Sequence, residues 1–314
     1  QVADINIGGS DSEPGRWMAM LVGDTIYFSA KDGNGPNFAG AELWAHDTSN
    51  HSTWQVADIN SGAGESFPGS DMAILVGNTI YFNAIDGITG NELWAHDTSN
   101  HSTWQAADIL AGSSSPGSGG GYDDMAILVG DTIYFLANGG NGGELWAHDT
   151  SNHSTWEVVD INNNGGNAEL GQNIRILVDD TIYFDADDGQ TGKELWAHDT
   201  SNHSTWQVTD IRAQAGTGSS PGMYMAMLVG DTLYFSASDG IIGNELWAHD
   251  TSNHSTWPVT DISSVSSGGS EDTDPGIYME ILVGDTIYFS ARQGGQDIEL
   301  WAHDTSNHST WQAT

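Results

Sequence analysis

The sequence contains no cysteine among its 314 residues, which excludes a disulfide-stapled scaffold and a thiol nucleophile. Only six residues are Lys or Arg, whereas 43 are Asp or Glu, and the formal net charge is −37. Because a chain of this charge repels phosphate groups, we expect it to bind neither nucleic acid nor an anionic membrane surface. It also lacks an apolar run long enough for a membrane-spanning helix, so we expect no membrane insertion.

The shortage of cations also bears on the surroundings in which the chain folds. Its carboxylates repel one another, and salt or divalent cations relieve this repulsion, so the composition suits a saline, halophilic-type exterior. The sequence starts at Gln1 rather than at Met, as expected when a leader has been cleaved. We therefore prefer an extracellular or cell-surface location, with a trimmed chain as the plain alternative.

One thirteen-residue string, ELWAHDTSNHSTW, occurs six times without a change. Its copies begin at Glu42, Glu92, Glu144, Glu194, Glu245 and Glu299, and the sequence between them varies in letters and in length. Internal repetition with a period of roughly 50 residues is typical of closed or stacked repeat assemblies. It predicts a single domain over residues 1–314 that is built from six units.

Each unit has the pattern of four short antiparallel strands. In the second unit, residues 71–84 read as an apolar strand, a tight Gly-Asn turn and a second strand rich in β-branched and aromatic residues. The strands ELWAHD and TWQAADI follow, on either side of the turn TSNHS, and helical periodicity is absent. Six such sheets predict an all-β fold, a six-bladed β-propeller of four-stranded antiparallel blades.

The two ends of the sequence predict how the ring closes. Internal copies continue from the last Trp of the string as W-x-x-x-D-I, but the final copy stops at Thr314, before its Asp-Ile. The first five residues supply the missing pair as Asp4 and Ile5. We expect this N-terminal segment to join the last blade and to leave no free sheet edge. In the alternative, it completes a neighbouring molecule and produces self-assembly into chains or rings.

The repeat resembles a known family. The string D-I-N-x-G-x-G-x-S-x-P, the strand T-I/L-Y-F, the segment A-x-D-G-x-x-G-x-E-L-W and a seven-residue turn are similar to bacterial and archaeal extracellular repeats of the ELWxxDGTxxGT type. The resemblance covers the whole chain and implies a propeller-like protein, secreted or attached to the cell surface, with no single activity. The chain departs from the pattern in the turn Asp47–Thr53, which keeps its length but has neither of the family's glycines.

Variation in loop length separates two ends of the predicted blades. The turns between the first and second strands and between the third and fourth keep one length in all six units. The other connections vary, as in the insertion Asn34–Gly40 of the first unit. In an up-and-down blade the constant turns lie at one end and the variable connections at the other. One face is therefore predicted to be six-fold repetitive and the other irregular.

The repetitive face carries the candidate ligand-binding residues, and every histidine of the chain lies in the repeated string. The candidates are Trp44, His46, Asp47, Asn50, His51 and Trp54 in the first copy, and His96, Asn100, His101, His148, Asn152, His153, His198, Asn202, His203, His249, Asn253, His254, His303, Asn307 and His308 in the later copies. In the plainest interpretation, the Asp, Ser and Asn side chains cap turn amides, and the tryptophans pack between blades.

Two other interpretations make the string a binding site. Tryptophan rings stack on sugars, Asp, Asn and His supply directed hydrogen bonds, and six weak glycan sites on one face gain avidity. Alternatively, the two histidines of each turn bind zinc, copper or nickel through neutral imidazoles, although their spacing matches no standard ligand motif.

The string also contains an N-x-S sequon, which predicts six sugars on one face if the protein is secreted from a glycosylating organism. The candidate glycosylation sites are Asn50, Asn100, Asn152, Asn202, Asn253 and Asn307. Because the copies repeat one segment, they count as a single coincidence.

The variable face carries weaker candidates. Turn formation explains the Asp-Gly pairs at Asp32, Asp86, Asp188 and Asp239 first. The loop Gly268–Gly276 is a candidate calcium site through Asp272 and Asp274, and calcium is the one cofactor that the sequence suggests. One position of the innermost strand reads Ala19, Ala73, Ala126, Arg175, Ala226 and Glu280. We expect Arg175 and Glu280 to face the channel and to form an ion pair across it.

The sequence favours a binding protein over an enzyme. It has neither G-x-S-x-G nor H-E-x-x-H, and no histidine lies outside the repeated string to act as a lone base. We expect a secreted, non-enzymatic propeller that serves as a multivalent, lectin-like surface module, with a glycan or another cell-surface component as its partner. A structural or adhesive subunit of an extracellular assembly, N-glycosylated at the sequon, is the first alternative, and a propeller hydrolase is the second.

Overall fold

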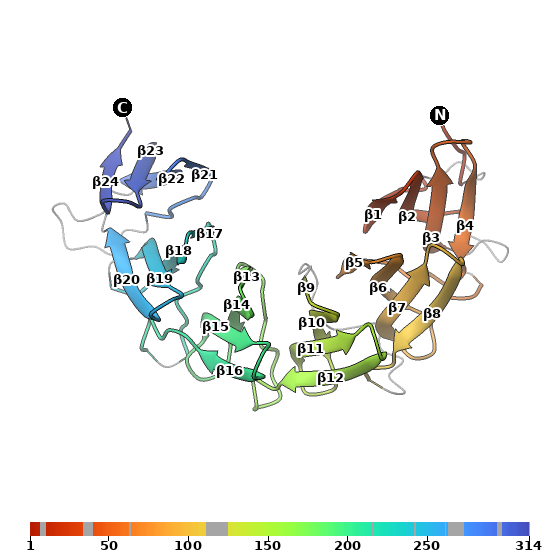
Figure 1. Ribbon diagram of the computed structural model, residues 1–314, viewed down its shortest axis with the longest axis horizontal. Coiled ribbons are helices and arrows are strands. Elements are labelled where there is room, and N and C mark those ends of the chain that lie inside the picture. The colour runs from red at the N-terminus through yellow and green to blue at the C-terminus, as the bar shows by residue number, and fades with distance from the viewer. Residues whose placement is uncertain are drawn as a thin grey trace. The chain divides into compact units, whose positions relative to one another are not determined.

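The regular elements of the computed structural model are strands, β1 to β24 (Figure 1). The structure describes residues 1–6, 11–33, 40–62, 64–110, 125–214, 216–241, 243–260, 262, 273–293 and 297–313. Within these ranges it contains no helix, and so no helix with the length and apolarity to cross a membrane. The strands form six separate sheets of four, and in each sheet the strands pair antiparallel in chain order. The prediction of six four-stranded propeller blades is confirmed.

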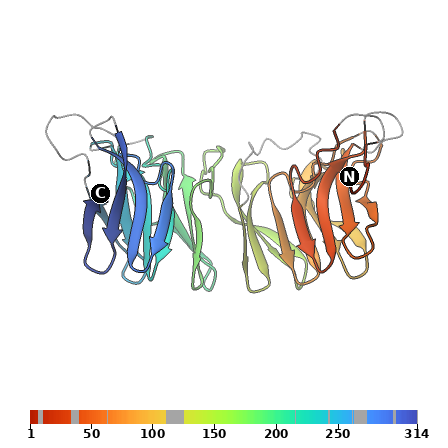
Figure 2. The ribbon, with the colours of Figure 1, turned by 90° about the horizontal axis from the view of Figure 1, so that it is seen from above.

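The chain divides into two compact units, and the first, Gln1–Val158, holds three blades. Blade 1 consists of β1 (Ala19–Val22), β2 (Thr25–Lys31), β3 (Ala41–Asp47) and β4 (Thr53–Ala57). Blade 2 consists of β5 (Ala73–Val76), β6 (Thr79–Ile85), β7 (Asn91–Asp97) and β8 (Ser102–Ala107). Blade 3 consists of β9 (Ala126–Val129), β10 (Thr132–Asn138), β11 (Gly143–Asp149) and β12 (Ser154–Val159). Figure 2 shows the strands of each blade running side by side between two ends.

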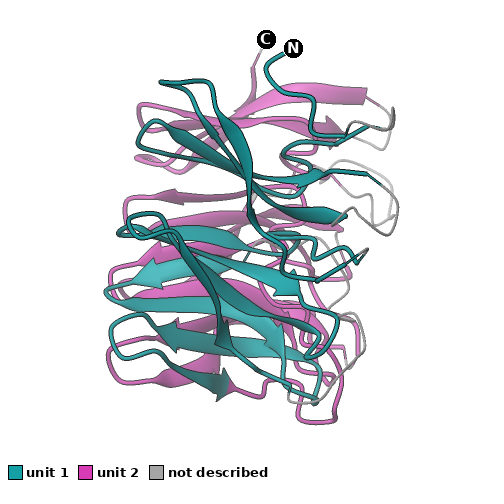
Figure 3. Cartoon of the chain, turned by 90° about the vertical axis from the view of Figure 1, so that its right-hand side faces the viewer, with its two compact units in different colours: residues 1–158 teal, residues 159–314 magenta. Residues whose placement is uncertain are grey.

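The second unit, Val159–Thr314, holds the other three blades (Figure 3). Blade 4 consists of β13 (Arg175–Val178), β14 (Thr181–Asp187), β15 (Lys193–Asp199) and β16 (Ser204–Gln207). Blade 5 consists of β17 (Ala226–Val229), β18 (Thr232–Ser238), β19 (Asn244–Asp250) and β20 (Ser255–Thr260). Blade 6 consists of β21 (Glu280–Val283), β22 (Thr286–Gln293), β23 (Asp297–Asp304) and β24 (Ser309–Gln312).

Neighbouring blades within a unit share an apolar core. Successive side chains of a strand point to opposite faces of its sheet, so the middle blade of a unit presents one face to the blade before it and one to the blade after it. Tyr27 and Leu43 of blade 1 pack with Ile80 and Phe82 of blade 2 in one cluster. On its other face blade 2 presents Tyr81, which packs with blade 3. Because both faces of blade 2 are covered, its second strand is apolar on both sides instead of alternating with polar residues.

The tight turn between the first two strands depends on a left-handed residue. Gly77 occupies this position in blade 2 with a φ of 60°, and the space beside its Cα is open. Blade 4 has Asp179 at the equivalent position, with a φ of 51°. This conformation costs an L-residue free energy that glycine does not incur.

Ring closure by the N-terminal segment remains a prediction. Residues 1–6 form no strand, and the last strand of blade 6 ends at Gln312. Of the first-blade insertion Asn34–Gly40, residues 34–39 lie outside the described residues.

Candidate functional site: the repeated hairpin

The repeated string forms the hairpin between the third and fourth strands of every blade, and this hairpin is tied to the turn between the first and second strands. In blade 2 the backbone N–H and the hydroxyl of Thr98 both donate to the carbonyl of Asn78 at 2.8 Å. The same pair of bonds recurs from Thr48, Thr150, Thr200, Thr251 and Thr305. The two turns of constant length therefore lie at the same end of each blade, as the sequence predicted.

A single carboxylate organises each hairpin. Asp97 accepts hydrogen bonds from the backbone N–H of Ser99 at 2.8 Å, from the Ser99 hydroxyl at 2.5 Å and from the Asn100 amide at 2.7 Å. The Oδ1 atom of Asn100 then accepts from the N–H of Ser102 at 2.9 Å. These bonds, first of all that from the Ser99 hydroxyl, lower the pKa of Asp97. The prediction that Asp and Asn cap turn amides is confirmed, whereas the serine hydroxyl donates to the aspartate instead of capping an amide.

The residue after the asparagine is an exposed histidine with a left-handed backbone. His101 has a φ of 62°, and its equivalents have φ values of 59° to 62°. Both Asn100 and His101 are exposed, as are their counterparts in all six hairpins. Each tip therefore displays one asparagine and one histidine on a backbone that the aspartate holds in place.

The other histidine of the string is buried in five of the six copies, whereas His46 of the first copy is half-buried. His96 is fully buried, and its Nδ1 atom lies 2.8 Å from the hydroxyl of Thr103 on the neighbouring strand. Its ring packs against Tyr27 of the preceding blade, with the ring centroids 5.2 Å apart. Burial lowers the pKa of His96 to about 4. Both histidines of a hairpin were candidate binding residues, but His96 is buried and His101 is exposed to solvent.

This arrangement gives little support to metal binding by the histidine pair. The ring centroids of paired histidines lie 6.3 to 6.5 Å apart in the hairpins of blades 1, 2, 3, 5 and 6. The Nδ1 atom of the inner ring already faces a threonine hydroxyl in each hairpin. Among the described residues, no group of three or more His, Asp or Glu side chains could hold a metal ion.

The tryptophans of the string serve mainly as packing residues. Trp94 and Trp54 are half-buried and pack against the core between blades 1 and 2. Only Trp301, at 9% exposure, is buried, and only Trp311, at 40%, is exposed; the other hairpin tryptophans are intermediate. The predicted packing between blades is thus observed for Trp54, whereas Trp44 is half-buried and belongs to none of the core clusters described for the two units.

The calcium candidates of the variable end are engaged within the protein. The Asp86 carboxylate accepts from the N–H groups of Ile88 and Thr89, both at 2.7 Å, as expected of a turn-forming residue. Asp274 lies 3.1 Å from the Nε atom of Arg292, so its carboxylate has a cationic partner. Its proposed co-ligand Asp272 lies outside the described residues.

Arg175 and Glu280 stand at the first position of β13 and β21, and both are exposed. Among the ion pairs of the described residues none joins them, so the expected pairing is not observed.

The first residue of the string has a role that the sequence analysis missed. Glu42 is fully buried and accepts from the Ile59 N–H at 2.8 Å and from the Ser66 hydroxyl at 2.7 Å. It thereby connects its own strand to the end of β4 and to the segment that enters blade 2. Glu194 holds Ile211 and Ser219 in the same way, and Glu245 holds Ile262 and Thr273. The regular spacing between the repeated string and the S-x-P segment after it was the feature of the sequence from which this role could have been predicted.

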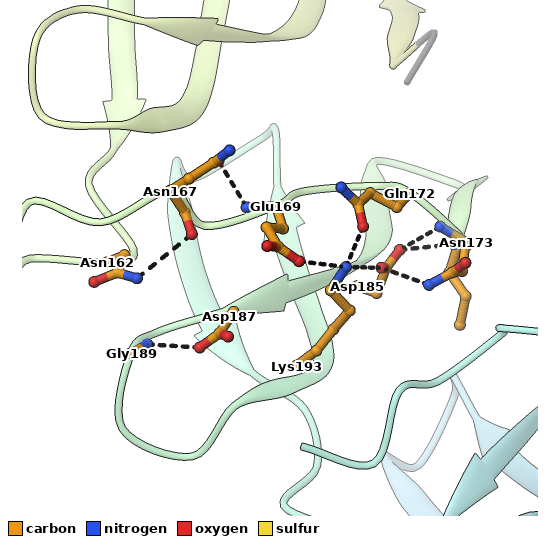
Figure 4. A network of polar contacts seen from close by, with 10 residues as sticks. Asn162, Asn167, Glu169, Gln172, Asn173, Asp185, Asp187, Gly189 and Lys193 are labelled. Atoms are coloured by element: carbon orange, nitrogen blue, oxygen red, sulfur yellow. Dashed lines mark hydrogen bonds and ion pairs between the residues drawn. The ribbon is translucent and has the colours of Figure 1, made fainter. Parts of the chain in front are cut away.

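A second missed feature is a buried ion pair at the variable end of blade 4 (Figure 4). Asp185 is fully buried, and its carboxylate accepts from the N–H groups of Asn173 and Ile174 at 2.8 Å. Lys193 lies 3.7 Å from Asp185 and 3.0 Å from Glu169. The equivalents of Asp185 in blades 1, 2, 5 and 6 are Ser29, Asn83, Ser236 and Ser290, which bond the same backbone segment. The network therefore anchors a loop, with Lys193 placed beside the one member that is a carboxyl group, whose pKa is raised by burial.

Trp17, the tryptophan outside the repeated strings, forms a third unpredicted cluster. It contacts Phe67 edge to face at a centroid distance of 5.1 Å, and Arg16 and Lys31 lie over its ring at 5.3 and 5.5 Å. Both cations also pair with Glu13, at 2.7 and 3.4 Å. In the sequence, the only indication of this cluster is that Trp17 lies outside the repeated strings.

Comparisons with known proteins add information on the fold alone. No family model matches the chain, and no curated protein matches it. Oligopeptidase B from Leishmania major superposes with a TM-score of 0.50 at 10% identity, over 94% of this chain and 40% of that one. The designed protein Ika8 gives 0.45 at 9% identity, over 94% and 72%, and TolB from Acinetobacter baumannii gives 0.38 at 13%, over 92% and 64%. The first of these likenesses agrees with the propeller-type blades.

Proposed function

We propose that this protein is a secreted, non-enzymatic surface module that binds a polyhydroxylated ligand, such as a glycan, through its six hairpin tips. The observation that carries the proposal is that every hairpin presents the same exposed asparagine and histidine on a turn fixed by the same hydrogen bonds. A turn that is already ordered loses little conformational entropy on binding. Six identical weak sites on one chain then gain affinity through avidity.

The chemistry available at one tip suits hydroxyl groups. One N–H of the Asn100 amide donates to Asp97, which leaves the second N–H for a ligand. Its carbonyl oxygen accepts from Ser102 and retains one lone pair. The neighbouring exposed imidazole of His101 adds one donor and one acceptor when neutral. Donor and acceptor pairs of this kind bind sugar hydroxyls, whereas the half-buried tryptophans contribute their edges at most.

A glycan array, with and without calcium, tests the proposal. The matched variant replaces the exposed histidine of all six hairpins by asparagine, which tolerates the left-handed backbone and so preserves the fold. The control variant replaces Ile88 and Ile241, which are 76% and 75% exposed in the loops between second and third strands, by serine. We expect saturable binding by the parent and the control and its loss in the histidine variant. Equal binding by all three proteins, or none by any, contradicts the proposal.

The alternative is a structural or adhesive subunit that is N-glycosylated at the hairpins. It is favoured by the exposure of Asn50 and its five equivalents at the tips. It requires that a sugar replace one hydrogen of an amide that donates to Asp47 at 2.7 Å. Intact-mass measurement of the protein from its natural source distinguishes the two: sugar increments together with an empty glycan array favour the structural subunit.

A further inference from the structure

The buried histidines of the hairpins stand at the junctions between blades, and four of them have the same surroundings. His96 packs on Tyr27, His148 on Tyr81, His249 on Tyr183 and His303 on Tyr234, with ring centroids 5.2 to 5.6 Å apart. In each case the tyrosine belongs to the preceding blade of the same unit and is almost fully buried. The imidazole is therefore a contact between blades as well as a part of its own hairpin.

Each of these imidazoles has one polar partner for its two nitrogens. The Nδ1 atom lies 2.7 to 2.9 Å from a threonine hydroxyl, of Thr103, Thr155, Thr256 and Thr310 respectively. The Nε2 atom is buried and has no hydrogen-bond partner among the described residues. A neutral imidazole tolerates this arrangement, since it carries only one N–H. An imidazolium carries two, so protonation would bury a charge and a second donor without a partner.

The charged groups around the ring do not compensate such a cation. For His96 they are Asp97 and His101 of its own hairpin, and Tyr27 from the facing blade. Asp97 favours the charged ring, but its carboxylate is already bonded to Ser99 and Asn100. His101 opposes it, because a second positive charge 6.5 Å away repels the first. Tyr27 contributes an aromatic ring and no charge. The balance is the same for His148, His249 and His303.

We propose that these four histidines are acid-sensitive contacts between blades. They hold neighbouring blades together while neutral and loosen the blade junctions when protonated. The geometry supports this, because an imidazolium in the closed junction would bury a charge and an Nε2–H without a hydrogen-bond partner, and water reaches that N–H only when the junction opens. The protein would thus keep its blades packed at neutral pH and open them in an acidified compartment.

The direction of the pH effect follows from the folded and unfolded protonation states. Burial lowers the pKa of each ring from 6.5 to about 4. Between these values the unfolded chain binds more protons than the folded chain, so the histidines' contribution to stability is complete above pH 6.5 and is lost as the pH falls toward 4. The buried carboxylate Glu42 acts in the opposite direction, since its pKa is raised to about 8. A variant that removes only the histidines is needed to separate the two effects.

The test compares thermal unfolding at pH 7.5 and pH 5 for three proteins. One is the parent, one carries H96Q, H148Q, H249Q and H303Q, and the control carries H101N, H153N, H254N and H308N at the exposed positions. We expect the midpoint of the parent and of the control to fall by roughly 10 °C between the two pH values. The midpoint of the variant that lacks the four buried histidines should fall by at most about a third of that amount. The proposal is overturned if the midpoint falls equally in the variant of the buried histidines and in the variant of the exposed histidines.

A second measurement keeps the proposal testable if the inner variant fails to fold. Histidine ring signals of the parent protein are followed by NMR from pH 7.5 to pH 4.5, with the outer rings assigned from the control variant. We expect the four inner rings to keep their neutral shifts to about pH 5 and then to change together with loss of blade-junction amide protection. Titration of inner and outer rings in parallel, with protection unchanged, contradicts the proposal.

Discussion

At the scale of single residues, the repeated string is explained by the separate tasks of its letters. The aspartate caps the turn, and the threonine after it donates a hydrogen bond to the turn between the first two strands. The glutamate accepts a hydrogen bond from the segment that enters the next blade. The exposed histidine closes the turn only through its backbone, because its N–H donates to the aspartate carbonyl at 2.8 Å while its ring caps no group of the turn. It also stands in a left-handed conformation that glycine would adopt at lower cost. This is why the binding proposal rests on it.

The turn between first and second strands offers a residue-scale prediction with a built-in control. Asp179 has a φ of 51° and is exposed, where five other blades have glycine. D179G should stabilise the protein by about 0.5–1 kcal/mol, because it removes backbone strain. The reciprocal change G130D should destabilise it by a similar amount, since the space beside Gly130 is open and only its φ of 59° opposes a side chain. Denaturant unfolding measures both, and changes of the same sign would refute this explanation.

At the scale of strands and hairpins, the buried glutamates connect successive blades. Burial raises the pKa of Glu42 to about 8, although the Ser66 hydroxyl and two backbone N–H groups lower it. The folded protein therefore holds a proton on Glu42 that the unfolded chain releases above pH 4.5, and its stability falls as the pH rises toward 8.

The variant E42Q should abolish this dependence. Relative to the parent, it should gain about 2 kcal/mol in free energy of unfolding between pH 5.5 and pH 8.5. E42A, which leaves the Ile59 N–H without its acceptor, should be destabilised by ~2–4 kcal/mol at both pH values. Chemical unfolding at the two pH values measures this, and a constant difference between E42Q and the parent would exclude the ionisation argument.

Much of this element-scale structure could be predicted from the sequence, because period, turn residues and β-branched strands are local signals. The four strands, the shared end of the constant turns and the capping by Asp47 follow from them. The different environments of His96 and His101 could not be predicted, because the burial of His96 depends on a tyrosine from another blade. For the same reason, the bonds from Glu42 to Ser66 and the Asp185–Lys193 pair appear only once the loops are folded.

At the scale of the whole molecule, charge dominates. With a net charge of −37, mutual repulsion of carboxylates opposes the compact state, and only six cations offset it. At least four of these cations are already committed to local ion pairs, as Arg16, Lys31, Lys193 and Arg292 show.

Salt should therefore stabilise the protein through screening. Raising NaCl from low concentration to about 1 M should increase the thermal midpoint by several degrees, because screening shortens the range of the repulsion to about 3 Å. Differential scanning calorimetry at constant pH checks this, with sucrose as an uncharged control. A midpoint that falls with salt would mean that the ion pairs outweigh the repulsion.

The central claim is that six equivalent tips act together, and a graded series tests it most directly. Variants with the exposed histidine replaced by asparagine in one, three and all six hairpins are compared with the parent for binding to a surface that carries the glycan selected by the array. Multivalent binding predicts that the apparent affinity falls slightly with one replacement, by more than tenfold with three, and below detection with six. The account is contradicted if a single replacement abolishes binding, or if replacement of all six leaves it unchanged.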